Sequence, residues 1–182
     1  PEQAFSGIHF PAAPEDVRQA RRRLIFEELF LFCLAGQRLK QEAVRAPGAV
    51  LARRDPEDFF RSLPFSPTDA QRRATAQCFA DLCSGRRMNR LLQGDVGSGK
   101  TLVAAACAWL ACQNGLQAAI MAPTELLARQ HMQTLRQLLS PFAIPVELLC
   151  GSTSAPERRR ILSLAQEDGP LVLCGTHALI QS

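Results

Sequence analysis

The sequence of 182 residues lacks several features that would place it in a class of protein at once. It has no apolar run near the roughly 20 residues that span a bilayer, and its first ten residues lack the basic start and apolar core of a secretory signal. No two of its seven cysteines have C-x-x-C spacing, and their odd number argues against a disulfide framework. We therefore expect a cytoplasmic protein with no membrane partner, in which the cysteines pack as small apolar side chains.

The composition excludes little else. Hydrophobic residues make up 47% of the chain and charged residues 21%, as in ordinary globular proteins. The formal net charge of +4 is compatible with a polyanionic partner, but a solvated basic surface explains it almost as well.

Residues 14–44 predict one long helix. Pro14 suits its first turn, and Glu15 and Asp16 suit its positive end. Because residues 26–34 are apolar on more than one face, we expect this helix to be clamped between two surfaces as a connector.

The chain beyond this helix changes character twice. Prolines and glycines between residues 46 and 67 indicate a linker with at most a short helix at about 57–62. After it, short apolar strands alternate with helices, which predicts an α/β fold with a parallel, covered sheet. The expected elements are helix 68–83, strand 90–93, helix 100–114, strand 117–121, helix 125–139, strand 145–149, helix 156–165 and strand 171–174.

A glycine-rich segment between a predicted strand and a predicted helix matches the phosphate-loop pattern. Its glycines let backbone amides turn inward around phosphates, and the following helix points its positive end at the same place. Lys100 would reach the β- and γ-phosphates of ATP, and the Thr101 hydroxyl would bind Mg²⁺, which makes these two the candidate catalytic residues. A chance match in a turn is the alternative, and the flanking elements disfavour it. The candidate loop is Gly94, Asp95, Val96, Gly97, Ser98, Gly99, Lys100 and Thr101.

Three further segments separate the classes of phosphate-loop protein. One lies ahead of the loop at residues 63–71, and two lie behind it at residues 122–131 and 175–179. Each of the last two follows a predicted strand, at the edge of a parallel sheet where ligands bind.

With these segments, the chain resembles superfamily 2 helicases and, among them, the RecG family of branched-DNA helicases. The resemblance runs from about Arg21 to the end and is strongest over 63–181. It implies that residues 1–62 are the tail of a wedge domain, a connector helix and a linker. Residues 63–182 would then be an incomplete RecA-like motor lobe. The family couples ATP hydrolysis to translocation on DNA, remodels forks and Holliday junctions by branch migration, and implies a monomeric full-length protein.

The same resemblance implies roles for individual residues. Gln71 would read the adenine edge with Phe65 packed on the ring, although Thr68 and Gln71 also have the spacing of a capping box. Thr124 would bind one DNA strand, although it would also serve as a plain N-cap. A lone histidine such as His177 is more often structural than a ligand. The implied DNA-binding residues are Pro123, Thr124, Glu125, Gly175, Thr176 and His177.

One region of a helicase motor has no match in the sequence. Helicase ATPases use an Asp-Glu pair at a strand end to hold Mg²⁺, and no predicted strand ends in this pair. The chain stops at Gln181-Ser182, about where the linker to that strand should begin. We therefore expect the 182 residues alone to bind nucleotide weakly without hydrolysing it, and to leave an unpaired sheet edge beside the phosphate loop.

Three other functions remain open at this point. The motor of the transcription-repair coupling translocase is similar, and a wedge domain upstream would separate the two. A non-catalytic nucleotide-binding module and a small-molecule kinase also carry phosphate loops. The segments at 124–125 and 175–177 have no role in a kinase.

Overall fold

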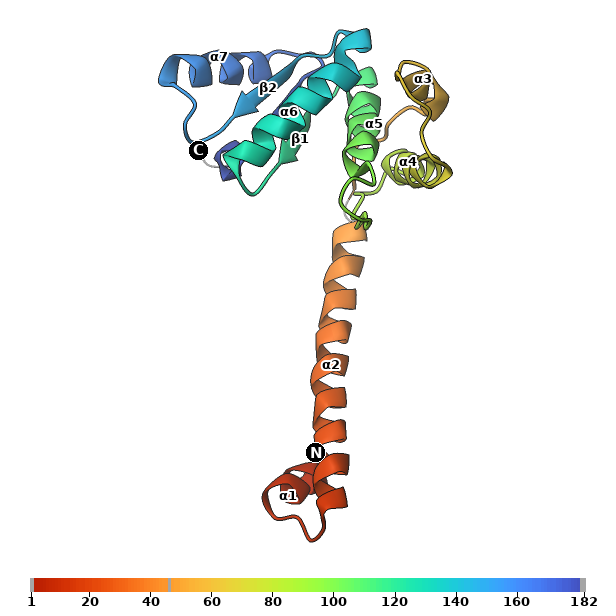
Figure 1. Ribbon diagram of the computed structural model, residues 1–182, viewed down its shortest axis with the longest axis vertical. Coiled ribbons are helices and arrows are strands. Elements are labelled where there is room, and N and C mark those ends of the chain that lie inside the picture. Colours follow the sequence, from red (N-terminus) through yellow and green to blue (C-terminus); the bar gives the residue numbers. More distant parts are fainter. Residues whose placement is uncertain (1, 46, 181–182) are drawn as a thin grey trace. The chain divides into compact units, whose positions relative to one another are not determined.

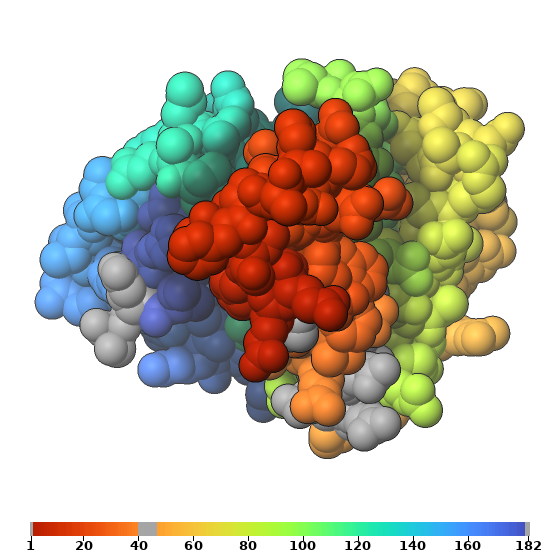
Figure 2. Space-filling model, turned by 90° about the horizontal axis from the view of Figure 1, so that it is seen from below, coloured from red at the N-terminus to blue at the C-terminus, as the bar shows by residue number. Residues whose placement is uncertain are grey.

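The computed structural model describes residues 2–45 and 47–180 (Figure 1). The packing divides the chain into two compact units, a helical unit of residues 1–46 and a sheet unit of residues 47–182. The helical unit holds α1 (Glu2–His9) and α2 (Pro14–Arg45). The two helices lie side by side, with Gly7 against Ala20. Figure 2 shows this end of the helical unit in red. Helix α1 falls where we expected only the tail of a wedge domain.

The long helix predicted at residues 14–44 is confirmed by α2. Asp16 in its first turn holds the residues before the helix, because its carboxylate accepts from the amides of Ala12 (3.1 Å) and Ala13 (2.9 Å). Its apolar middle stays exposed among the described residues, with Phe32 at 78%. Clamping between two surfaces therefore remains a prediction. None of the described helices has the length and apolarity needed to cross a bilayer.

The α/β class predicted for the rest of the chain is also confirmed. The helices and strands begin and end within about two residues of the expected positions, apart from the strand expected at 90–93. The elements of the sheet unit are α3 (Pro56–Phe60), α4 (Asp69–Leu82), α5 (Lys100–Gln113), β1 (Ala118–Met121), α6 (Glu125–Leu139), β2 (Val146–Leu149), α7 (Ala155–Gln166) and β3 (Val172–Gly175), with short 3₁₀ turns at Ser140–Phe142 and His177–Leu179.

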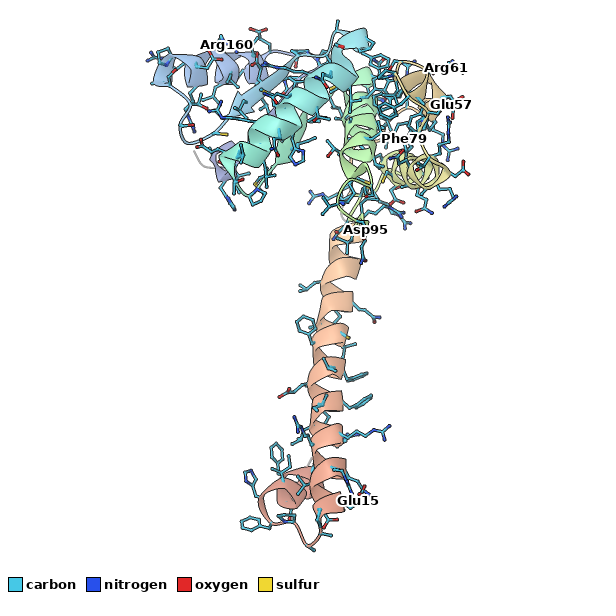
Figure 3. The ribbon with its side chains drawn as sticks, in the orientation of Figure 1. Glu15, Glu57, Arg61, Phe79, Asp95 and Arg160 are labelled. Atoms are coloured by element: carbon cyan, nitrogen blue, oxygen red, sulfur yellow. The ribbon has the colours of Figure 1, made fainter. Side chains whose placement is uncertain are left out.

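The sheet is parallel, with strand order β1-β3-β2. Alternate residues of the strands, such as Val146 and Val172, are buried against α5 and α6 on one face. Glu147 of the edge strand β2 pairs with Arg160 of α7 at 2.9 Å and with Arg136 of α6 at 3.4 Å. Arg160 is labelled on α7 in Figure 3. Both outer strands align with Gly175, so their carboxyl ends lie level with the end of the middle strand.

The expectation of a strand at 90–93 is wrong. These residues run without helix or strand structure into the phosphate loop, and Leu91 is 88% exposed. A strand needs a neighbour to pair with its amides and carbonyls, and no strand of the described residues lies beside this segment. The pairing that would make this segment a strand is absent from the described residues.

The expected linker joins the core of the sheet unit. Its short helix is α3, and Phe59 is fully buried against the rings of Trp109 and Phe142, at 5.9 and 6.0 Å between centroids. Asn114, at the end of α5, accepts from the Ala52 amide at 2.7 Å and donates to the Ala52 carbonyl at 3.3 Å. Packing thus divides the chain after residue 46, and the assignment of residues 1–62 to a wedge tail, connector and linker remains a prediction.

Candidate nucleotide and DNA site

The phosphate loop turns through two glycines at the start of α5. Gly97 and Gly99 have φ of +82° and +79°, a left-handed conformation that costs other residues about 1 kcal/mol or more. Gly99 is also the N-cap of α5, so the first amides of this helix have no partner within it. Asp95, labelled in Figure 3, lies in this loop, ahead of the first residue of α5. A helix start of this kind attracts anionic groups.

Lys100 is bonded to its own loop in this structure. Its Nζ donates to the carbonyl oxygens of Gly94 at 2.7 Å and Asp95 at 2.6 Å, and lies 3.5 Å from the Ser98 hydroxyl. An ammonium group that is satisfied by two carbonyls is placed to exchange them for the stronger acceptors of a phosphate. Next to it, Thr101 is half-buried in the first turn of α5.

Gln71 joins α4 to the phosphate loop. The capping box is confirmed, because the Gln71 amide donates to Thr68 Oγ1 at 3.3 Å and Gln71 Oε1 accepts from the Thr68 amide at 2.9 Å. The same side chain donates from Nε2 to the Ser98 carbonyl at 3.0 Å. The sequence showed the cap, but the bond to Ser98 spans 27 residues and no local signal predicts it.

The two predicted adenine contacts line different hollows. Gln71, together with Gly94, Ser98 and Lys100, lines a hollow of about 310 Å³ over the phosphate loop. Phe65 is half-exposed and lines another, of about 370 Å³, on the side of α3. Adenine contact by either residue remains a prediction.

The two DNA segments predicted from the sequence meet at the carboxyl edge of the sheet. We call residues 122–125 after β1, 150–153 after β2 and 175–177 after β3 the strand-end loops. The Ala122 amide donates to the Gly175 carbonyl at 2.8 Å, which joins the first and third of them directly. Gly175 is packed so closely that a Cβ there would collide with the carbonyl oxygen of Leu149 on β2.

Thr124 and His177 both begin helical turns. Thr124 Oγ1 accepts from the Leu127 amide at 3.3 Å, so the structural N-cap exists, and the hydroxyl hydrogen stays available to an acceptor. Thr176 precedes the turn His177–Leu179, and the His177 side chain is exposed. Pro123 is also exposed. These side chains share one edge of the sheet, as the resemblance implies, and their contact with DNA remains a prediction.

One contact at this edge had no signal in the sequence. The Glu125 carboxylate accepts from the Ser152 amide at 3.1 Å and from the Ser152 hydroxyl at 2.6 Å. These two bonds, first the hydroxyl and then the amide, lower the pKa of Glu125 from its ordinary value. Pairing of residues 27 positions apart follows from strand order, which a single sequence does not reveal.

The chain resembles helicases in both sequence and fold. ATP-dependent DNA helicase RecG of Bacillus subtilis is 41% identical over 98% of this chain and 27% of the relative. RecG of Thermotoga maritima is 42% identical over 99% of this chain and 23% of the relative. A solved structure of RecG bound to a three-way DNA junction superposes with a TM-score of 0.83 at 42% identity, covering 98% of this chain and 25% of that one.

More distant structures share the fold alone. One is a hypothetical ATP-dependent RNA helicase from Sulfolobus tokodaii, which superposes with a TM-score of 0.50 at 20% identity. That match covers 69% of this chain and 34% of the helicase. The chain spans about a quarter of the length of the curated relatives that it matches. Residues 68–182 match the family model of the DEAD/DEAH box helicases. Since that match covers more than half of the residues of this chain, the chain belongs to the DEAD/DEAH box helicase family.

Proposed function

We propose that this chain belongs to an ATP-dependent DNA helicase of the RecG type, which remodels branched DNA in recombination and repair. The arrangement of one sheet unit carries this proposal. A phosphate loop opens α5, and the strand-end loops carry the hydroxyls of the exposed Thr124 and the half-buried Thr176 at the carboxyl edge of the sheet. ATP binding and DNA binding therefore fall on one rigid framework, as a motor requires.

ATP and Mg²⁺ fit the residues of the phosphate loop. The left-handed Gly97 and Gly99, the start of α5 and the Lys100 ammonium group are donors suited to a triphosphate. Lys100 would hold the β- and γ-phosphates in place of the Gly94 and Asp95 carbonyls that it binds here, and Thr101 would bind the metal ion. The bound Mg²⁺ would neutralise charge on the phosphates during hydrolysis.

DNA would lie across the strand-end loops. We propose that the hydroxyls of Thr124 and Thr176, with the amides around Pro123 and Gly175, bind phosphates of one strand, because neutral donors at helix starts bind phosphate oxygens. His177 is placed to join them. A branched duplex is the proposed substrate, and the relative of known structure was solved on a three-way junction. We further infer that the full-length protein works as a monomer in the cytoplasm.

The full-length protein with Lys100→Ala tests this function. ATP hydrolysis stimulated by a three-way DNA junction should fall by roughly 10²-fold or more, the usual loss when a charge that clamps the transferred phosphoryl group is removed. Junction binding without nucleotide should persist, because Lys100 lies outside the strand-end loops. A wild-type protein that binds ATP but hydrolyses none with any DNA would instead indicate a non-catalytic nucleotide-binding module.

A further inference from the structure

The carboxylate of Glu125 connects the two outer strand-end loops. Glu125 is the first residue of α6, directly after the loop that follows β1, and Ser152 lies in the loop that follows β2. Both oxygens are used, Oε1 by the Ser152 amide and Oε2 by the Ser152 hydroxyl. Because the strand order is β1-β3-β2, these bonds span the end of the middle strand, where Gly175 and Thr176 lie.

The loop on the other side of this connection is itself closed. The Thr153 amide donates to the Cys150 carbonyl at 3.2 Å, and the Cys150 amide donates to Thr153 Oγ1 at 2.9 Å. Ser152 thus sits in a tight turn that can move only as a whole. Holding Ser152 therefore holds the entire 150–153 turn against the start of α6.

A direct contact between the Glu125 carboxylate and DNA is disfavoured. A carboxylate has no hydrogen to donate when ionised, and a phosphate diester repels it. Its lowered pKa keeps it ionised, with Arg129 adding to the effect of Ser152. Its bonds to Ser152 are complete above the ordinary carboxyl pKa and weaken only as the pH falls through the lowered value.

We propose that Glu125 is a positioning residue for DNA binding. It fixes the start of α6 to the 150–153 turn, so that Thr124 and Thr176 present their donors at a constant spacing to successive phosphates of one strand. Glu125 acts through Ser152 and does not touch the DNA. This role rests on the proposed DNA-binding function of the strand-end loops.

The test compares Glu125→Gln with Glu125→Ala in the full-length protein. Glutamine keeps an oxygen that accepts from the Ser152 amide and gains an NH₂ that can donate to the Ser152 hydroxyl, whereas alanine keeps neither. The readout is the junction concentration that gives half-maximal stimulation of ATP hydrolysis, alongside kcat. Glu125→Ala should raise this concentration roughly tenfold, as loss of a hydrogen bond to a charged group does, and Glu125→Gln should restore most of the loss.

Ser152→Ala and the double variant Glu125→Ala/Ser152→Ala complete the cycle. Ser152→Ala removes only the hydroxyl bond and leaves the bond from the backbone amide, so it should weaken junction binding less than Glu125→Ala does. The double change should be no worse than Glu125→Ala alone, because that change already removes both bonds. Glu157→Ala is the matched control, since Glu157 also lies in a first helical turn but pairs with Arg160 within α7. Circular dichroism of each variant separates loss of fold from loss of binding.

Three outcomes would overturn the proposal. The first is junction binding by Glu125→Ala that equals that of the wild type, and the second is binding by Glu125→Gln as weak as that of the alanine variant. The third is tighter binding by Glu125→Gln than by the wild type, which would show direct repulsion of phosphate. A wild-type protein whose ATP hydrolysis no DNA stimulates would instead refute the proposed function itself, so the two failures are distinguishable.

Discussion

The phosphate loop and the strand-end loops belong to one sheet unit, yet different bonds hold them. Side chains hold the phosphate loop, through Gln71 on the Ser98 carbonyl and Lys100 on two carbonyls. The segment that leads into it has no strand partner among the described residues. Backbone pairing holds the strand-end loops, through the three parallel strands and the bond from Ala122 to Gly175. A substitution should therefore rearrange the first region locally and unfold the second cooperatively.

Gly175→Ala, in the strand-end loops, should cause the largest loss of stability. A Cβ at Gly175 would collide with the Leu149 backbone, so we expect β2 and β3 to separate and the free energy of unfolding to fall by about 3 kcal/mol. Urea unfolding of the 182-residue chain measures this. Gly151→Ala is the control, because its nearest neighbour, Glu125 Oε1, lies at an ordinary 3.6 Å. Equal stability of the two variants would show that backbone pairing does not dominate at this edge.

Gly99→Ala should have a smaller effect, confined to the phosphate loop. Its φ of +79° costs an alanine about 1 kcal/mol, and the new Cβ would collide with Gln71 Nε2. We expect the free energy of unfolding to fall by about 2 kcal/mol in total, measured by urea unfolding. Nucleotide binding should also weaken, measured by titration with a fluorescent ATP analogue.

Gly115→Ala is the matched control for this loop, since its φ is +72° and no atom lies within 4 Å of the new Cβ. Gly115→Ala should lower the free energy of unfolding only by the cost of the left-handed backbone, about 1 kcal/mol. In the double variant Gly99→Ala/Gln71→Ala, the collision with Gln71 is gone, so the loss of stability beyond that of Gly115→Ala should disappear. If Gly99→Ala and Gly115→Ala cost the same, Gln71 does not hold the loop.

Thr75→Val should have the smallest effect on stability of the three changes, and it should stabilise the chain where the other two destabilise it. Thr75 lies on α4, is fully buried, and its hydroxyl has no hydrogen-bond partner among the described residues. Replacing it with an isosteric methyl should stabilise the chain by about 1 kcal/mol, measured as a rise in Tm. Thr134→Val, which removes an exposed hydroxyl bonded to the Gln130 carbonyl, should change little. A lower Tm for Thr75→Val would contradict the absence of a partner.

The sequence predicted what depends on neighbours along the chain. The caps at Thr68 and Thr124, with the alternation of apolar strands and helices, place α4 and α6 almost to the residue. These signals work because a helix satisfies its own amides and needs only local chemistry to begin.

The sequence did not predict what depends on partners far along the chain. Residues 90–93 have the composition of a strand but no neighbour to pair with among the described strands, so the pattern misled. The bond from Gln71 to Ser98 depends on how α4 packs beside the phosphate loop, and the bond from Glu125 to Ser152 depends on the strand order. The alternation of helices and strands leaves both open. Roles of single residues at the two sites stay predictions for the same reason.

The tight packing of Gly175 also bears on how variation among relatives is interpreted. Any side chain at this position would push β2 and β3 apart, so selection would remove such variants for failing to fold, before DNA binding came into play. An invariant glycine here would then record a steric limit of the sheet. Evolutionary constancy at Gly175 would be no evidence of contact with nucleic acid, whereas constancy of the neighbouring Thr176 hydroxyl, which caps no amide of the turn that follows it, would be.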